Sequence, residues 1–252
     1  GKGQYGALFQ VGLDFGAVYG RLVFIRQQNH HQIGGFGAAN TPDGHSDVDL
    51  SYKIMEAGYR CVYTPYSVLY HIGNHSWGAK KGKYKADIFC LKRWGKYVSE
   101  DPYFTDTMKQ AIYTDFRFNY KIYAQHIDPD IEYSGKDVLF VSHELSETGA
   151  PRMLYYAALA VKNSGGFPVV AAPIDGSLRQ AFIDAGIVVI VDESIRHSHF
   201  LFKAFARNFD TVVVNTIALA SVVRDLQEFD DLPVIWWLHE ARSLPESLAE
   251  YA

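Results

Sequence analysis

The pattern of apolar and polar positions divides the chain into two parts of different regularity. After residue 137, short runs rich in Val and Ile alternate with stretches whose apolar residues recur every three or four positions, as in an amphipathic helix. The predicted strands cover residues 138–141, 168–172, 187–191, 211–214 and 233–238, and the predicted helices cover 151–163, 177–185, 199–209 and 218–229. Strands that are apolar throughout and alternate with helices predict a parallel sheet covered on both faces, in a Rossmann-like doubly wound domain.

Ligands of such sheets bind beyond the carboxyl ends of the strands. We therefore expect binding residues at 143–150, 173–176, 215 and 239–240, which follow the predicted strands. In the first of these segments, a Thr-Gly pair gives a flexible turn and Pro151 suits the first helical position, so free backbone N–H groups there could receive an anion. A tight turn without a ligand is the alternative.

The first half of the chain is less regular. A strand-like stretch at 17–25 precedes a polar loop, and a predicted helix at 48–57 ends at Gly58, a natural C-cap. Residues 59–63 and 67–71 then have the composition of strands. The α/β character of this half is therefore expected, without a repeating pattern.

A polar and aromatic connector separates the two parts. We predict a first domain at 1–115, a linker at 116–135 and a second domain at 136–252. The charge supports two units with different surfaces: residues 1–136 carry 16 Lys and Arg against 13 Asp and Glu, a net +3, whereas residues 137–252 carry 8 against 15, a net -7.

Most of the basic excess lies between residues 80 and 96, interleaved with aromatic side chains. A solvated helical face is one interpretation, and contact with the phosphates of a nucleotide sugar, a lipid-linked acceptor or a membrane surface is the other. No motif for sequence-specific DNA binding is present, so no nucleic acid partner is expected. The basic residues are Lys80, Lys81, Lys83, Lys85, Lys92, Arg93 and Lys96.

The 252 residues are 48% hydrophobic and 21% charged, which excludes a disordered, collagen-like or coiled-coil chain. The longest apolar runs are far shorter than the roughly 20 residues of a membrane-spanning helix. Cys61 and Cys90 lie among apolar and aromatic residues, so we expect buried free thiols and a reducing, cytoplasmic environment. The chain starts without Met or an apolar signal region, which favours a segment cut from a longer polypeptide.

Two carboxylates at the start of the predicted helix are the densest candidate chemistry of the first half. Asp47 and Asp49 are two residues apart, so one can cap the helix while the other points into a cleft, where it could act as a general base. Taken alone, such a pair of aspartates is structural more often than catalytic. His71, near the end of a predicted apolar strand, is either a packed histidine or a ligand.

The run "QIGGF", the later "DVDLSYKIMEAGYRCVYTPYSVLYH" and then "DPYF" resemble the C-terminal half of the catalytic domain of family 2 glycosyltransferases, which have the GT-A fold. The resemblance covers about residues 8–110. It implies that Asp47 is the base that deprotonates an acceptor hydroxyl, and that His71 completes the coordination of Mg2+ or Mn2+ at the diphosphate of a nucleotide sugar. It further implies a lining of the acceptor and donor site by Gly34, Gly35, Phe36 and Asp49.

Two departures from that family stand out. Ser46 occupies a position where the family commonly has Glu or Asp, and residues 1–33 supply neither the nucleotide-binding strands nor the Asp-any-Asp metal motif of the fold. We therefore expect only the second half of a GT-A domain in this chain.

In the second half, "VLFVSHELSETGAP", "APIDGSLRQAFIDAGIVVIV", "NTIALASVV" and "PVIWWLHEARS" resemble the N-terminal lobe of family 4 glycosyltransferases, which have the GT-B fold. The resemblance covers about residues 136–252. It implies a lobe that mainly binds the acceptor, with a glycine-containing loop that approaches the donor diphosphate. The residues that match the cleft are His143, Gly149, Ala150, Asn215, His239 and Glu240. Arg242 either binds a phosphate or pairs with Glu240.

The two resemblances together predict a fragment of a modular bacterial glycosyltransferase of the hexosyltransferase type. Its partners would be a nucleotide-sugar donor and a glycan or lipid-linked acceptor of a growing cell-surface polysaccharide. We expect it in the cytoplasm, at the inner face of the membrane if the segment 80–96 contacts lipid. The alternatives are a non-catalytic carbohydrate-binding or scaffolding protein and a nucleotide-dependent oxidoreductase. The oxidoreductase is poorly supported, because the turn after the first predicted strand of the second half has no G-x-G-x-x-G motif.

Overall fold

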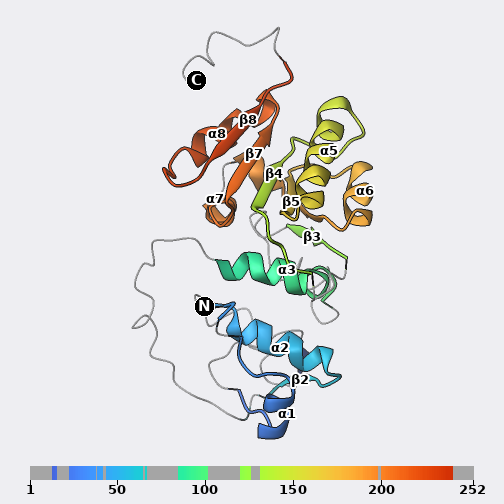
Figure 1. Ribbon diagram of the computed structural model, residues 1–252, viewed down its shortest axis with the longest axis vertical. Helices are drawn as coiled ribbons and strands as arrows, with labels where there is room; N and C mark the ends of the chain where they lie inside the picture. The colour runs from blue at the N-terminus through green and yellow to red at the C-terminus, as the bar shows by residue number, and fades with distance from the viewer. Residues whose placement is uncertain are drawn as a thin grey trace. The chain divides into compact units, whose positions relative to one another are not determined.

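A computed structural model describes residues 13–15, 23–37, 39–41, 44–64, 66, 85–101, 120–125, 131–197 and 200–240 (Figure 1). The chain divides into two compact units. The first consists of residues 1–90 and 100–114, and the second of residues 91–99 and 115–252. Within the described ranges, no helix is long and apolar enough to cross a membrane.

The second unit is built on a six-stranded sheet with the strand order β3-β6-β5-β4-β7-β8. The strands are β3 (Lys121–Tyr123), β4 (Asp137–Val141), β5 (Phe167–Ala172), β6 (Val188–Val191), β7 (Thr211–Asn215) and β8 (Val234–Trp237). The five strands from β6 to β8 in this order run parallel, and β3 pairs antiparallel with β6. All five predicted strands are present, so the Rossmann-like parallel sheet is confirmed.

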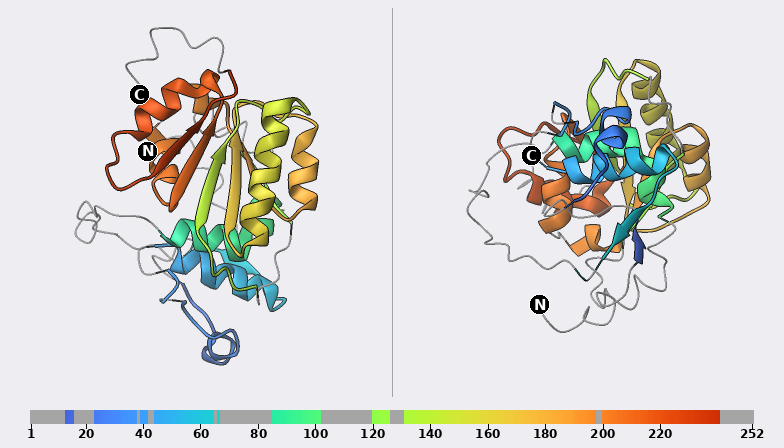
Figure 2. Two further views of the ribbon diagram at one scale, coloured as in Figure 1. Left: turned by 45° about the horizontal axis from the view of Figure 1, so that its top comes forward. Right: turned by 90° about the horizontal axis from the view of Figure 1, so that it is seen from below.

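Helices cover both faces of this sheet, as Figures 1 and 2 show, with α5 and α6 on one face and α7 and α8 on the other. Their bounds are α5 (Gly149–Asn163), α6 (Leu178–Asp184), α7 (Phe200–Ala206) and α8 (Ala220–Leu226), with 3-10 turns η3 (Glu193–His197) and η4 (Ile217–Leu219). All four predicted helices are therefore found. The chain leaves β4 toward β5 and β6 and then returns to β7 on the other side, which puts a topological switch point between β4 and β7.

The core of the second unit explains why its strands are apolar along their whole length. Both β4 and β5 are buried at every position. Leu154 and Ala158 of α5 and Phe182 of α6 pack in one cluster with Phe140 and Val170 of the sheet. Burial of apolar surface contributes about 25 cal/mol per Å², so this cluster stabilises the packing of α5 and α6 on the sheet.

Part of the predicted linker 116–135 is a strand of the sheet. Strand β3 lies in register with β6, with Ile122 opposite Ile190. Three residues are too few to show a period along the chain, so the sequence did not predict this strand.

Lys92, a residue of the basic segment, belongs to the second unit and is paired with a carboxylate. Its ammonium is 2.5 Å from Asp137 Oδ1 and 5.2 Å from the ring centroid of Tyr133. Lys92 therefore makes a structural ion pair. Lys85 and Lys96 are exposed, and Lys80, Lys81 and Lys83 lie outside the described residues.

The first unit contains a two-stranded antiparallel sheet of β1 (Leu13–Phe15) and β2 (Cys61–Tyr63), and the helices α1 (Gln27–Gln32) and α2 (Ser46–Glu56). The predicted helix at 48–57 is confirmed as α2, and Gly58 follows its C-cap with a φ of 82°. Residues 61–63 of the predicted strand 59–63 form β2.

Other expectations for the first unit have different outcomes. Of the predicted strand 17–25, residues 23–25 are not in a strand and 17–22 lie outside the described residues, as do 67–71. The helix α3 (Lys85–Ser99) begins in this unit. Cys61 and Cys90 are free and buried, as predicted. Burial raises the pKa of the Cys90 thiol to about 12.

Candidate functional site

The carboxyl ends of β4, β7 and β8 bring four predicted residues together, and we call this set the strand-edge site: Ala150, Asn215, His239 and Glu240. Asn215, the last residue of β7, is completely buried. Its amide nitrogen donates to the carbonyl oxygen of Ala150 at 2.9 Å, and its Oδ1 is 2.7 Å from Nε2 of His239. One buried side chain thus joins the start of α5 to the loop after β8.

Glu240 organises the backbone on the other side of Asn215. Its Oε2 accepts from the backbone N–H of His239 at 3.0 Å and from that of Ile217 at 3.4 Å. The carboxylate therefore bridges the loop after β8 and the 3-10 turn η4.

Thr216 lies between these residues and was not predicted. It has φ 71° and ψ 162°, a region that is almost restricted to glycine. Its N–H donates to the carbonyl of Trp237 at 2.9 Å, and its own carbonyl accepts from the Trp236 indole N–H at 2.9 Å. Contacts with β8 thus hold a strained backbone at the switch point. A threonine gives no sequence signal for such a conformation.

His143, in contrast, stays outside the hydrogen-bonded strand-edge site. Its Nε2 is 3.7 Å from Oε1 of Glu144, too long for a hydrogen bond, and its buried Nδ1 has no hydrogen-bond partner in the described part of the chain. The hydroxyl of Ser146 donates to Glu144 Oε1 at 2.5 Å and lies 2.9 Å from the Thr148 hydroxyl. The polar groups of this loop are therefore bonded mainly to each other.

Gly176, which the sequence did not mark as an individual site residue, allows close approach to the loop after β4. A Cβ on Gly176 would overlap the carbonyl of Leu145. Around it, the N–H of Leu145 donates to the carbonyl of Ile174 at 3.2 Å, and that of Leu178 to the carbonyl of Leu145 at 2.9 Å. A Cβ at Gly149 would meet nothing within 4 Å. The space around this predicted site residue therefore does not require a glycine.

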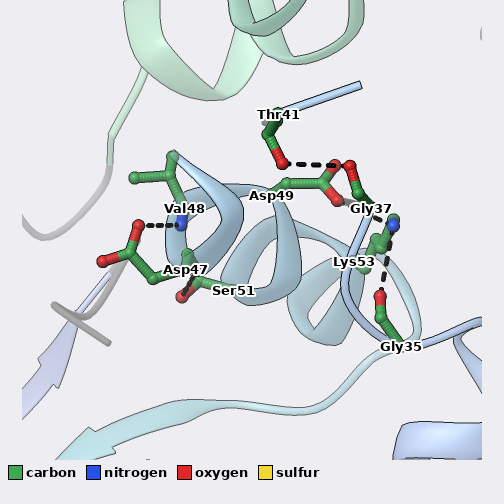
Figure 3. Close-up of polar contacts among 8 residues, drawn as sticks. All are labelled: Gly35, Gly37, Thr41, Asp47, Val48, Asp49, Ser51 and Lys53. Carbon is green, nitrogen blue, oxygen red and sulfur yellow. Dashed lines mark hydrogen bonds and ion pairs between the residues drawn. The ribbon is translucent and has the colours of Figure 1, made fainter. Parts of the chain in front are cut away.

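The second cluster lies at the start of α2 in the first unit, and we call it the α2 site: Gly35, Gly37, Asp47, Asp49 and Lys53 (Figure 3). The side chain of Asp49 is fully buried, and its Oδ2 is 2.7 Å from Nζ of Lys53. Lys53 also donates to the carbonyl of Gly35 at 3.3 Å. Asp49 therefore acts in a buried ion pair that ties the loop before α2 to the helix.

Asp47, the predicted base, is only half-buried. Its Oδ1 accepts from the backbone N–H of Val48 at 2.9 Å, and its carbonyl accepts from the Ser51 hydroxyl at 2.7 Å. The side chain thus contacts one of the N–H groups at the N-terminus of α2, the favourable end for a carboxylate.

The predicted sugar-lining segment has a structural role that accounts for its glycines. Gly34 and Gly35 have φ 75° and 62°, and their N–H groups donate to the carbonyls of His31 and His30 at the end of α1. Phe36, which follows them, is 52% exposed, with its ring centroid 5.8 Å from that of His30. The glycine pair therefore ends α1 and presents an exposed aromatic ring.

Gly37 fixes the other end of this loop. A Cβ there would be 2.6 Å from Oδ2 of Asp49, and the carbonyl of Gly37 accepts from the Thr41 hydroxyl at 3.0 Å. Neither Gly37 nor Lys53 was predicted from the sequence. The four-residue spacing of Asp49 and Lys53 on a helix was the signal that could have found the ion pair.

His45 is a further residue that was not predicted. It precedes α2 in the left-handed conformation, with φ 61°, and its Nε2 is 2.6 Å from Oδ1 of Asp87. The hydrogen bond to Asp87 raises the pKa of His45 above 6.5, against the opposing effect of burial. The carboxylate of Asp47 adds to the rise.

The described residues do not form a metal site. Within these ranges, no three His, Cys, Asp or Glu side chains come together in a way that could hold an ion, and Asp49 is paired with Lys53. His71, the predicted metal ligand, lies outside the described residues, as does Arg242.

Comparison with known proteins supports one of the two resemblances. Residues 134–249 match the model of the family described as "Glycosyl-transferase family 4". The match supports a glycosyltransferase for the part of the chain that carries the Rossmann-like sheet, and it does not extend to residues 1–133.

An uncharacterised protein of Sinorhizobium fredii (strain NBRC 101917 / NGR234), y4gI, is 28% identical over 95 residues. These residues are 35% of this chain and 10% of that protein, so the chain spans a small part of the relative. No solved structure matches.

Proposed function

We propose that this chain is part of a glycosyltransferase that transfers sugars from nucleotide-sugar donors to a growing cell-surface polysaccharide or glycan. The observation that carries the proposal is the strand-edge site, which lies at a switch point inside the segment matched by family 4. Ligands bind at this position in doubly wound sheets. An amide, an imidazole and a carboxylate at one edge suit a ligand rich in hydroxyl groups.

In this proposal the second unit is the lobe that binds the acceptor. Gly149 and Ala150, at the start of α5, approach the donor diphosphate, where helical N–H groups favour an anion. His239 and Glu240 contact the sugar, and Asn215 holds Ala150 and His239 in place. His143 lines the same edge from the loop after β4.

The first unit is proposed as the second half of a GT-A domain with Asp47 as its base. Asp47 takes the proton of an acceptor hydroxyl, the oxygen bonds to the anomeric carbon, and the nucleoside diphosphate leaves with the electrons of the broken bond. Mg2+ or Mn2+, with His71 as a ligand, would neutralise the charge of the departing diphosphate. Gly34, Gly35 and Phe36 line the sugar-binding site. The protein acts in the cytoplasm, at the inner face of the membrane.

The test uses the full-length parent protein, with the two glycosidic linkages of the product measured separately by mass spectrometry. Asp47→Asn should abolish one linkage and His239→Ala the other. Glu56→Gln, an exposed change on the same helix as Asp47, is the matched control and should leave both linkages. Normal formation of both linkages by both site variants would refute the proposal.

A non-catalytic carbohydrate-binding protein is the second candidate. Ser46 at an otherwise acidic position and the engagement of Asp49 by Lys53 favour it for the first unit. A parent protein that binds glycan but forms neither linkage would support this candidate.

A further inference from the structure

The orientation of the Asn215 amide is determined by its neighbours. The carbonyl oxygen of Ala150 can only accept a hydrogen bond, so the group that faces it at 2.9 Å must be the NH2 of Asn215. The oxygen Oδ1 of the same amide therefore faces His239. A flipped amide would put two oxygens together at Ala150 and is excluded by this network.

That orientation in turn decides the state of the His239 ring. Oδ1 of Asn215 is an acceptor, so Nε2 of His239, 2.7 Å away, must carry a hydrogen. A neutral imidazole has one N–H, so its Nδ1 then has a lone pair. We infer that Asn215 is a positioning residue that keeps neutral His239 in the Nε2–H tautomer, so that Nδ1 accepts a hydrogen bond from a ligand hydroxyl.

The surroundings of His239 leave Nδ1 accessible. The residue is exposed, and in the described part of the chain Nδ1 has no hydrogen-bond partner. The neighbouring carboxylate of Glu240 is engaged by two backbone N–H groups. The indole of Trp237 lies 5.1 Å from the imidazole, centroid to centroid, at an interplanar angle of 32°, and supports one side of it.

A lone pair at this position selects among the chemical groups of a ligand. A sugar hydroxyl can donate to Nδ1, whereas an ionised phosphate oxygen cannot. The hydroxyl as ligand rests on the proposed function, but the tautomer depends only on Asn215 and Ala150. His239 is thus assigned to a sugar and not to the diphosphate of a donor.

The tautomer is read directly from long-range 1H–15N NMR spectra of the 15N-histidine-labelled 252-residue chain. The His239 signals among ten histidines are assigned by their loss in His239→Gln. For the neutral ring, we expect a protonated Nε2 and an unprotonated Nδ1. A protonated Nδ1 would overturn the inference.

Two variants separate positioning from folding. Asn215→Asp keeps an oxygen that can accept from Nε2, and should retain the tautomer. Asn215→Ala removes it, and should give a mixture of tautomers and faster solvent exchange of the Nε2 proton. A well-dispersed amide spectrum verifies folding of each variant. An unchanged pure Nε2–H tautomer with unchanged exchange in a folded Asn215→Ala would contradict the role of Asn215.

The ligand is tested on the same signal with methyl hexosides and inorganic pyrophosphate as probes. Hexosides should shift the Nδ1 resonance of the wild type, and pyrophosphate should not. The reverse result, or no response to any hexoside, would overturn the assignment to a hydroxyl. Loss of transferase activity in the parent with the tautomer intact would refute the proposed function alone.

Discussion

The strand-edge site and the α2 site hold their polar side chains in different ways. In the strand-edge site, a buried neutral amide joins an imidazole to a backbone carbonyl, and a carboxylate accepts from backbone N–H groups. In the α2 site, Asp49 is paired with Lys53, and just before the same helix His45 is paired with Asp87. Burying a charge costs far more than burying a hydrogen-bonded amide. The strand-edge site therefore depends mainly on hydrogen bonds to the backbone, and the α2 site on paired charges.

Removal of one buried charge should have the largest effect. Asp49→Asn leaves Lys53 without its charged partner, and we expect the free energy of unfolding of the first unit to fall by about 3 kcal/mol. Hydrogen exchange of the α2 amides measures this. The double variant Asp49→Asn/Lys53→Met should recover part of the loss. If Asp49→Asn is no more destabilising than Glu56→Gln, the first unit does not depend on this pair.

The addition of a Cβ where two loops approach closely in the second unit should have the next largest effect. Gly176→Ala places a Cβ against the Leu145 carbonyl and should destabilise the unit by about 2 kcal/mol in a urea titration. Gly149→Ala is the matched control, because a Cβ there meets open space. Equal stability of the two variants would mean that close approach of the two loops is unimportant.

Relief of backbone strain should give a smaller effect of opposite sign. Thr216→Gly permits the positive φ without a Cβ, and we expect the second unit to gain about 1 kcal/mol after the entropy cost of glycine. Thr211→Gly, at the other end of β7, should instead destabilise it. Thermal unfolding measures the stability of both variants. A loss of stability in both would show that Thr216 is not strained.

The pH dependence of the first unit should be the smallest effect. The pKa of His45 is raised in the folded state, so its pairing with Asp87 stabilises the unit fully below pH 6.5 and is lost as pH rises through the folded pKa. The side chain is 45% exposed, so solvent reduces the effect. Thermal unfolding between about pH 6 and about pH 9 should show a slope that His45→Gln flattens. An unchanged slope in His45→Gln would show that a group other than His45 causes the pH dependence of stability.

The fold of the second unit was largely predictable, because a parallel strand buried on both faces must be apolar along its whole length. The runs at β4 and β5 therefore appeared directly in the sequence. Strand β3 did not, since only its register with β6 makes three residues of the connector a strand. In the first unit, the helical spacing of apolar residues and the C-terminal Gly58 were sufficient to predict α2, whereas the sequence around β1 had no detectable strand pattern.

The sites were predictable to a smaller extent. Asn215, His239 and Glu240 were expected at one edge, because the carboxyl ends of parallel strands meet there. Thr216 was missed, because backbone strain does not change the pattern of apolar and polar residues along the chain. Lys53 was missed, because the burial of its partner Asp49 does not change that pattern either.

The sequence by itself thus determined where the parallel strands and their helices lie, and at which edge of the sheet polar residues gather. These are consequences of burial and periodicity among neighbouring residues. Only the tertiary structure decided that Asn215 joins Ala150, 65 positions away, to His239, and that the pair of Asp49 and Lys53 ties a loop to α2. The direction of a hydrogen bond depends on which groups meet through space, and no local pattern contains that information.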